Sequence, residues 1–142
     1  MSAANEPALT AFLQARLLCT LATVTAAGRP QAAFVAYVSN ARHEIIIGTS
    51  NQSRKFKNLT HNKSVALVIA DETGEVQYEG QVGLITLADY EALLAAGDFQ
   101  QLAGFDKYRH DPDQVYLKIK PTWIRFIVHG EPDQVHEFTE FA

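Results

Sequence analysis

The chain has 142 residues, of which 47% are hydrophobic and 20% are charged, and its formal net charge is −4. This length and composition predict one globular domain over residues 1–142 with a core of its own. The acidic balance argues against nucleic-acid binding, and no apolar run is long enough to cross a membrane. With no signal-peptide pattern and a single cysteine, we expect a cytoplasmic protein.

The first half of the chain predicts a helix, three strands and a short helix. Residues 5–7 are typical of a helix start, and apolar residues then recur at helical spacing up to Leu17. Three strands are expected at CTLATVT, QAAFVAYVS and EIIIGT, joined by turns at AAGRP and NARH. Cys19 lies in the first strand, where we expect a buried small hydrophobe. The short helix should run from Ser53 to about His61.

The second half predicts four more strands and a helical insert. The nearly continuous apolar run SVALVIAD predicts a strand buried on both faces, and Gly80 and Gly83 mark a bulge or bend in VQYEGQVGLITL. ADYEALLAA is helical by pattern, and GDFQQLAGF predicts a further turn or two of helix. The last strands, QVYLKIK and TWIRFIVHG, should be separated by Pro121. Antiparallel strands with short turns favour a mainly β, α+β fold: a small closed barrel with helices outside.

The start of the short helix carries an unusual charge pattern. Ser53 is the expected N-cap, yet Arg54 and Lys55 follow it, although a helix N-terminus favours acidic residues by about 0.3–1 kcal/mol each. Four of the twelve Lys and Arg residues lie in residues 54–63, after a loop of small and hydroxyl residues. One interpretation is a solvated helix start. The other is a bound phosphate, at which N–H groups, hydroxyls and cations would all point.

The other polar residues give weaker signals. Residues 108–111 form a polar cluster before a strand, either as a solvated loop or as the lining of a pocket. Trp123 and Arg125 are two positions apart on one strand and share a face, where they either stack for packing or line a ligand site. We identify no side-chain nucleophile or catalytic acid. Five histidines lack metal-ligand spacing, predict no metal site and are expected on the surface or in loops: His43, His61, His110, His129 and His136.

Four segments together resemble the FMN-binding split-barrel family related to pyridoxamine 5′-phosphate oxidase. They are LATVTAAGRPQAAFVAYV, IIIGTSNQSRKFKNLTHNKSVALVI, YEGQVGLI and KIKPTWIRFIV, and they span about residues 17–127. The resemblance implies a split β-barrel of antiparallel strands with flanking helices. It also implies a homodimer with two FMN sites at the interface, so that each site takes residues from both subunits.

The resemblance assigns most of the cofactor contacts. It implies that the backbone of residues 33–36 touches the flavin ring, that residues 48 and 49 contact the cofactor, and that residues 53–55 bind the FMN phosphate. Trp123 and Arg125 on the last strand complete the predicted set. The predicted cofactor-binding residues are Ala33, Phe34, Val35, Ala36, Gly48, Thr49, Ser53, Arg54, Lys55, Trp123 and Arg125.

Two departures separate this chain from the oxidase proper. Ala33 stands where the oxidase has a phosphate-binding arginine, and the chain ends in EFTEFA instead of an Arg-Leu-Ala-Pro-type ending. We therefore expect an FMN-dependent oxidoreductase acting on an unidentified small molecule. The alternatives are a non-catalytic flavin-binding or stress-response protein, or a relative that binds deazaflavin F420 or haem.

The insert from residue 88 to residue 111 has two interpretations. It is either the wall that selects substrates or a helical cap over one end of the barrel. Its aromatic residues are Tyr90, Phe99, Phe105 and Tyr108.

Overall fold

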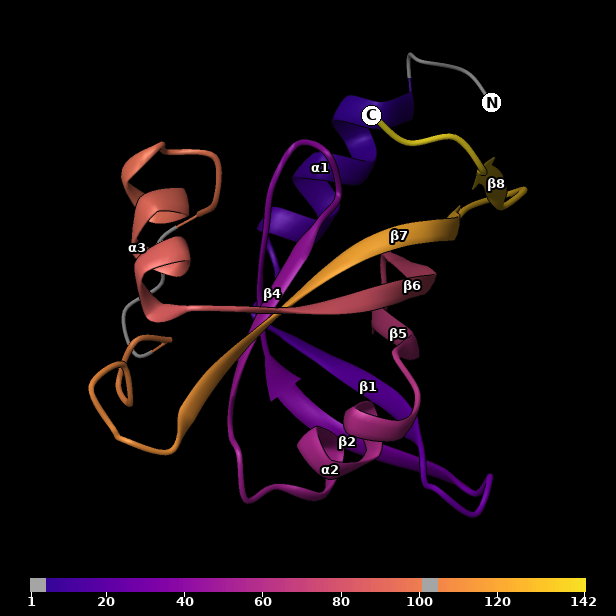
Figure 1. Ribbon diagram of the computed structural model, residues 1–142. Helices are drawn as coiled ribbons and strands as arrows, with labels where there is room; N and C mark the ends of the chain where they lie inside the picture. The colour runs from indigo at the N-terminus through magenta and orange to yellow at the C-terminus, as the bar shows by residue number, and fades with distance from the viewer. Residues whose placement is uncertain (1–4, 101–104) are drawn as a thin grey trace.

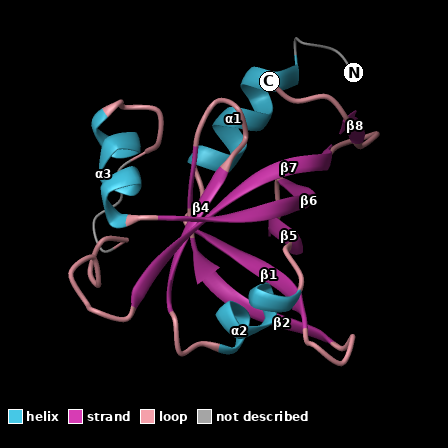
Figure 2. Cartoon of the chain, in the orientation of Figure 1, coloured by secondary structure: helices cyan, strands magenta, loops and turns pink. Residues whose placement is uncertain are grey.

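The computed structural model describes residues 5–100 and 105–142. Within these residues the chain forms three helices and one sheet of eight strands (Figures 1 and 2). The elements are α1 (Glu6–Gln14), β1 (Leu18–Val24), β2 (Pro30–Ala36), β3 (Val38–Ser39), β4 (Ile45–Ser50), α2 (Arg54–His61), β5 (Ser64–Asp71), β6 (Gly74–Ile85), α3 (Leu87–Ala95), β7 (Gln114–Val128) and β8 (Gln134–Phe138).

The sheet is antiparallel throughout and strongly curled. Its strand order is β2-β1-β5-β6-β7-β4-β3, and the long β7 pairs on one edge with β6 and on the other with β4 and then β8. The three helices lie around the curled sheet, with α1 at the top, α3 at the left and α2 at the bottom of Figure 1. This arrangement confirms the predicted mainly β, α+β split barrel with flanking helices.

The pairing does not close into the expected complete barrel. The predicted strand over residues 31–39 is two strands, β2 and β3, which pair with β1 and β4 respectively. Tyr37 separates them, because its side chain is buried, its hydroxyl donates to the carbonyl of Leu13 and its N–H donates to that of Leu17. Among the described strands, β2 and β3 are therefore the two ends of an open ladder.

Two apolar clusters hold the fold together. The main core fills the curled sheet, and a second cluster lies between α3 and the other face of β4 and β7. Strand β4 contributes to both clusters, since Ile45 and Ile47 face the first and Ile46 the second. Helix α1 buries three apolar residues as predicted, but it ends at Gln14, and Leu17 is 53% exposed beyond it.

Strand β5 differs from its prediction in burial. Val65, Leu67 and Ile69 are buried, but Val68 on the opposite face is 43% exposed. The strand is therefore buried on one face only in the single chain, because among the described residues no helix covers the outer side of β5. Cys19 on β1 is buried as expected, and burial raises the pKa of its thiol to about 12. The cytoplasmic location stays a prediction.

Pro121 does not end a strand, contrary to the prediction. Strand β7 continues through it, and the β6–β7 register shifts at this point: Gly80 pairs with Pro121 and Glu79 with Trp123. Thr122 is the extra residue of a β-bulge, which accommodates the missing N–H of proline. The predicted bulge at Gly80 is confirmed.

The chain after β6 adds two further differences. The predicted helical extension fails over residues 97–100, and residues 101–104 lie outside the described residues. Strand β8, which was not predicted, pairs with the end of β7. None of the helices in the described ranges is long and apolar enough to span a membrane.

His43 lies in a loop, which agrees with the prediction of a surface or loop position, but it is buried. It sits at the β3–β4 turn with a φ of 63°, only 4% exposed, because α1 covers this turn. Its Nε2 lies 3.0 Å from the Thr10 hydroxyl on α1, and its carbonyl accepts a hydrogen bond from the hydroxyl of Tyr78. Burial lowers the pKa of His43 below its ordinary value.

Replacing His43 with asparagine should flatten the pH dependence of stability. Because the folded-state pKa of His43 lies below the unfolded value of about 6.5, the neutral imidazole adds to the free energy of unfolding. This contribution is complete above pH 6.5 and is lost as pH falls through the folded-state pKa. Asparagine tolerates the positive φ and does not titrate. Urea unfolding between pH 7.5 and 5 should therefore give a shallower slope of unfolding free energy against pH. Exposed His110→Asn is the control, and equal slopes in the two variants would contradict this.

Candidate functional site

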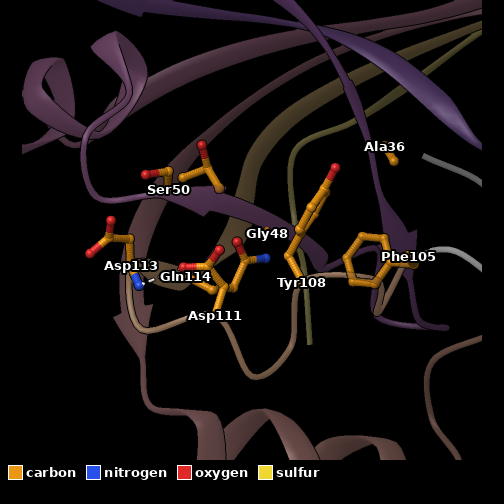
Figure 3. A pocket seen from close by; sticks show the side chains of 9 residues that line it. Ala36, Gly48, Ser50, Phe105, Tyr108, Asp111, Asp113 and Gln114 are labelled. Carbon is orange, nitrogen blue, oxygen red and sulfur yellow. Dashed lines mark hydrogen bonds between the residues drawn. The ribbon is translucent and has the colours of Figure 1, made fainter.

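A cavity of about 430 Å³ lies between the end of β4 and the loop that precedes β7. Figure 3 shows its side chains, with Phe105 and Tyr108 from the loop on one side and the end of β4 on the other. It is lined by Ala36, Gly48, Thr49, Ser50, Phe105, Tyr108, Asp111, Asp113 and Gln114.

Gly48 gives the cavity its floor. A Cβ at this position would lie 2.5 Å from Nε2 of Gln114 and 3.3 Å from the ring of Tyr116, its partner on β7. Any side chain here would displace the Gln114 amide and reduce the space beside β4. Glycine at residue 48 therefore leaves room for the Gln114 amide beside β4.

Hydrogen bonds join the end of β4 to the start of α2. The Ser53 hydroxyl accepts from the backbone N–H of Phe56 as the predicted N-cap. Thr49 Oγ1 donates to Ser53 Oγ at 3.1 Å and accepts from Lys55 Nζ at 3.2 Å. Three of the predicted cofactor-binding residues are therefore one hydrogen-bonded unit.

Lys55 is held over this unit without a neutralising partner. Its side chain is half-buried, and burial lowers the pKa of its ammonium group. In the part of the chain that the structure describes, no ion pair involves Lys55 or the exposed Arg54. The first N–H groups of a helix have no intrahelical partner. Two hydroxyls, a partly desolvated cation and free N–H groups therefore surround a place that suits an anion.

Asn58 fixes α2 against the sheet. It is buried, and its Nδ2 donates to Thr23 Oγ1 on β1 and to Gln31 Oε1 on β2, both at 3.0 Å. The position of the start of α2 relative to β2 therefore depends on a polar contact that the sequence analysis missed. A single asparagine in a helical pattern gives no signal of its tertiary partners.

The predicted ring-contacting residues, Ala33 to Ala36, lie on β2. Among the described strands, β2 pairs with β1 alone, so the backbone groups of its other edge have no ladder partner. Ala36 is the one of the four that lines the cavity, and Phe34 is 71% exposed on the outer face. The free edge has the geometry that backbone contacts to a planar ring require. The contacts themselves stay a prediction.

Trp123 and Arg125 lie away from the cavity in the single chain. They follow the bulge in β7, pair with Glu79 and Gln77 on β6, and neither lines the cavity. No stacking contact between them is present among the described residues, and the buried Nε of Arg125 has no hydrogen-bond partner there. Their assignment to a cofactor site stays a prediction.

The loop before β7 contributes more to the cavity than the sequence indicated. Tyr108 and Asp111 of the predicted polar cluster line it, which favours the pocket over the solvated loop. Tyr90 and Phe99 of the insert belong to the second core, and Phe105 lines the cavity. A role of the insert in selecting substrates stays a prediction. Among the described residues, no group of His, Cys, Asp and Glu is arranged to hold a metal ion. The lining residues that the sequence analysis missed are Ser50, Asp113 and Gln114.

Comparison with known proteins gives one family match. The model of the pyridoxamine 5′-phosphate oxidase family matches residues 6–128. No curated protein matches the chain at a significant level.

Solved structures share the fold at low sequence identity. A haem-binding protein from Mycobacterium smegmatis is 23% identical with a TM-score of 0.73, and the match covers 98% of this chain and 58% of that protein. An FMN-binding protein from Nostoc punctiforme, related to pyridoxamine 5′-phosphate oxidase, is 16% identical with a TM-score of 0.72. The match covers 100% of this chain and 97% of that protein. An F420 reductase is 22% identical with a TM-score of 0.61, and the match covers 80% of this chain and 93% of that protein. The shared fold is thus found with three different cofactors.

Proposed function

The chain belongs to the pyridoxamine 5′-phosphate oxidase family, and on that premise we propose that it binds FMN and acts as an FMN-dependent oxidoreductase on a small molecule. The observation that carries the proposal is Lys55, a half-buried ammonium group without an ion-pair partner among the described residues. It lies on the Thr49–Ser53 pair at the start of α2, beside the cavity. A bound phosphate monoester would supply the missing negative charge.

The residues present fit FMN at both of its ends. Lys55, the two hydroxyls and the free N–H groups of α2 would hold the phosphate. The unpaired edge of β2 would accept the hydrogen-bonding edge of the ring. A bound flavin supplies the redox chemistry itself, so this chain would bind it, orient it and shape the space for a substrate.

Haem fits this site less well than FMN. Haem iron in proteins is usually held by His, Cys, Met or Tyr. Neither the predicted cofactor-binding residues nor the cavity lining contain His, Cys or Met, and Tyr108 is the one residue of these types among them. Deazaflavin F420 also carries a phosphate that the Lys55 site would accept, so the choice between the two flavins needs a spectrum.

The absorbance spectrum of the purified protein tests the cofactor, since flavin, deazaflavin and haem have distinct bands. Stopped-flow mixing with NADH or NADPH, then with oxygen or a quinone, tests the activity. We expect the flavin band to bleach and recover faster than that of free FMN. Bleaching by chemical reductant but by neither donor would support a non-catalytic flavin-binding protein, once a deazaflavin donor has also failed. A haem band, or the absence of FMN binding, would overturn the proposal.

We also propose a homodimer formed through the outer face of β1, β2 and β5. Thr20 pairs with both Phe34 and Val68, so these side chains form one strip across three strands. Phe34, Val68 and the nearby Leu18 are exposed in the single chain, by 71%, 43% and 46%. An apolar strip of this kind is typical of a protein interface, and a two-fold dimer is the commonest closed assembly.

Replacing Val68 with glutamate should convert the dimer to a monomer. The substitution puts a charge into the centre of the proposed interface, whereas Val68 lies outside the predicted cofactor-binding residues. Sedimentation velocity at micromolar concentration should give a dimer for the wild type and a monomer for Val68→Glu. Leu87→Glu, at an exposed apolar position on α3, is the control and should stay dimeric. A monomeric wild type with its cofactor bound would contradict the interface.

A further inference from the structure

The wall of the cavity that the loop before β7 forms is negatively charged. Asp111 and Asp113 line it, and both are exposed to solvent. No lysine or arginine is among the lining residues. The cavity therefore combines acidic and aromatic groups, unlike the start of α2, which combines hydroxyls with cations.

The acidic wall and the proposed anion site meet at β4, because Thr49 lines the cavity and also accepts a hydrogen bond from Lys55. Side chains alternate along a strand, so Thr49 points away from the face on which Gly48 and Ser50 lie. Thr49 accepts its hydrogen bond from Lys55, whereas Gly48 lies under Gln114. The proposed phosphate site and the acidic wall therefore share Thr49 but differ in charge, since Lys55 lies at the first and Asp111 and Asp113 at the second.

The loop that carries the aspartates is held in place at several points. The Tyr90 hydroxyl donates to Asp106, which also pairs with Arg109. The Asp113 N–H donates to Asp111 Oδ1 at 2.9 Å, and the carbonyl of Asp113 accepts from the N–H of Asn51 at 2.8 Å. Arg109 is therefore neutralised inside the loop, and the aspartates keep fixed positions at the cavity.

Two aromatic rings form the rest of this wall. Phe105 and Tyr108 both line the cavity and come from the loop before β7 (Figure 3). Tyr108 is 56% exposed, and its hydroxyl makes no hydrogen bond within the described residues. Its ring already attracts a cation, because Lys107 Nζ lies 5.4 Å from the ring centre. Lys107 is itself exposed and is not a lining residue.

From this wall we infer that the cavity takes a flat aromatic molecule with a positive charge, and that it disfavours phosphate esters and other anions. The inference rests on the proposed function, in which this molecule is the substrate beside the cofactor. Tyr108 and Phe105 offer ring faces for stacking and for cation–π contact. Asp111 and Asp113 attract the positive charge and repel a negative one.

Three dyes with one tricyclic ring test the charge preference at pH 7.5: cationic 9-aminoacridine, neutral acridine and anionic acridine-9-carboxylate. Each is titrated by fluorescence into the FMN-loaded protein at low salt. We expect the affinity order cation, neutral, anion. In Asp111→Asn/Asp113→Asn the cation should bind about three- to tenfold more weakly and the neutral dye unchanged, because exposed charge pairs contribute modestly. Asparagine keeps the acceptor oxygen at residue 111, so the loop should stay intact.

Further variants separate the two parts of the inference. Tyr108→Ala should weaken all three dyes by about two- to tenfold, and Lys107→Gln should strengthen the cation. Glu72→Gln, an exposed carboxylate in the β5–β6 turn, is the control and should change nothing. Equal affinity for the three dyes, or release of FMN by the cation, would overturn the inference. Absence of FMN binding with the dye preference intact would instead overturn the proposed function.

Discussion

Replacing Lys55 with alanine should weaken FMN binding by about 10- to 150-fold and leave riboflavin binding nearly unchanged. The Lys55 ammonium group is half-buried at the start of α2 without an ion-pair partner among the described residues, so a phosphate would gain a charge-assisted hydrogen bond. Such bonds contribute about 1.5–3 kcal/mol, and 1.4 kcal/mol is a factor of ten in affinity. Arg54→Ala should have a smaller effect, because Arg54 is exposed.

Quenching of flavin fluorescence measures both affinities. The matched control is Lys57→Ala, which removes the same charge from an exposed position on the same helix and should cost little. Riboflavin lacks the phosphate, so the wild type should bind it more weakly than FMN. Equal losses in the two lysine variants, or equal wild-type affinities for FMN and riboflavin, would contradict the phosphate site.

Replacing Gly80 with alanine should destabilise the fold by about 3 kcal/mol, at the upper end of the range for overpacking. A Cβ at residue 80 would lie 2.5 Å from the carbonyl oxygen of Lys120 and 2.8 Å from Cγ2 of Ile119. The first contact is backbone in the paired strand β7, so relief requires β6 and β7 to move apart at the bulge.

Gly83→Ala on the same strand is the matched control. A Cβ there would lie 4.0 Å from its nearest neighbour, and the position is exposed. Its unfolding free energy should change by no more than about 0.5 kcal/mol. Urea unfolding of both variants measures the difference. Similar stabilities for the two would show that the bulge tolerates a side chain.

The sequence predicted those parts of the site that depend on local physics. Two cations after Ser53 oppose the helix dipole wherever the helix lies, so the start of α2 could be identified before its surroundings were known. The structure adds the hydrogen bond from Lys55 to Thr49, which makes Lys55 a stronger candidate than Arg54 for the proposed phosphate contact. Trp123 and Arg125 do not line the cavity in the single chain, so their assignment to the cofactor site stays a prediction.

The features that the sequence did not predict depend on partners far along the chain. Strand propensity is the same on both sides of Tyr37, and only the partner strands divide β2 from β3. Strand β7 passes Pro121 because Gly80 on another strand makes the bulge. Asp113 lines the cavity because β7 brings it beside Asn51, about 60 positions earlier. His43 is buried because α1 folds over its turn.

Tyr37 sets the width of the gap between the two ends of the ladder. It is the single residue between β2 and β3, and its bonds to Leu13 and Leu17 fix it to the end of α1 and the start of β1. Length variation at this point would change how far β2 diverges from β4, and thus the shape of the cavity that Ala36, Gly48 and Thr49 line. Insertions in the exposed turn at residues 26–29 would leave that spacing intact. Variants of this fold with an altered cavity shape are therefore best sought by changing the chain length next to residue 37.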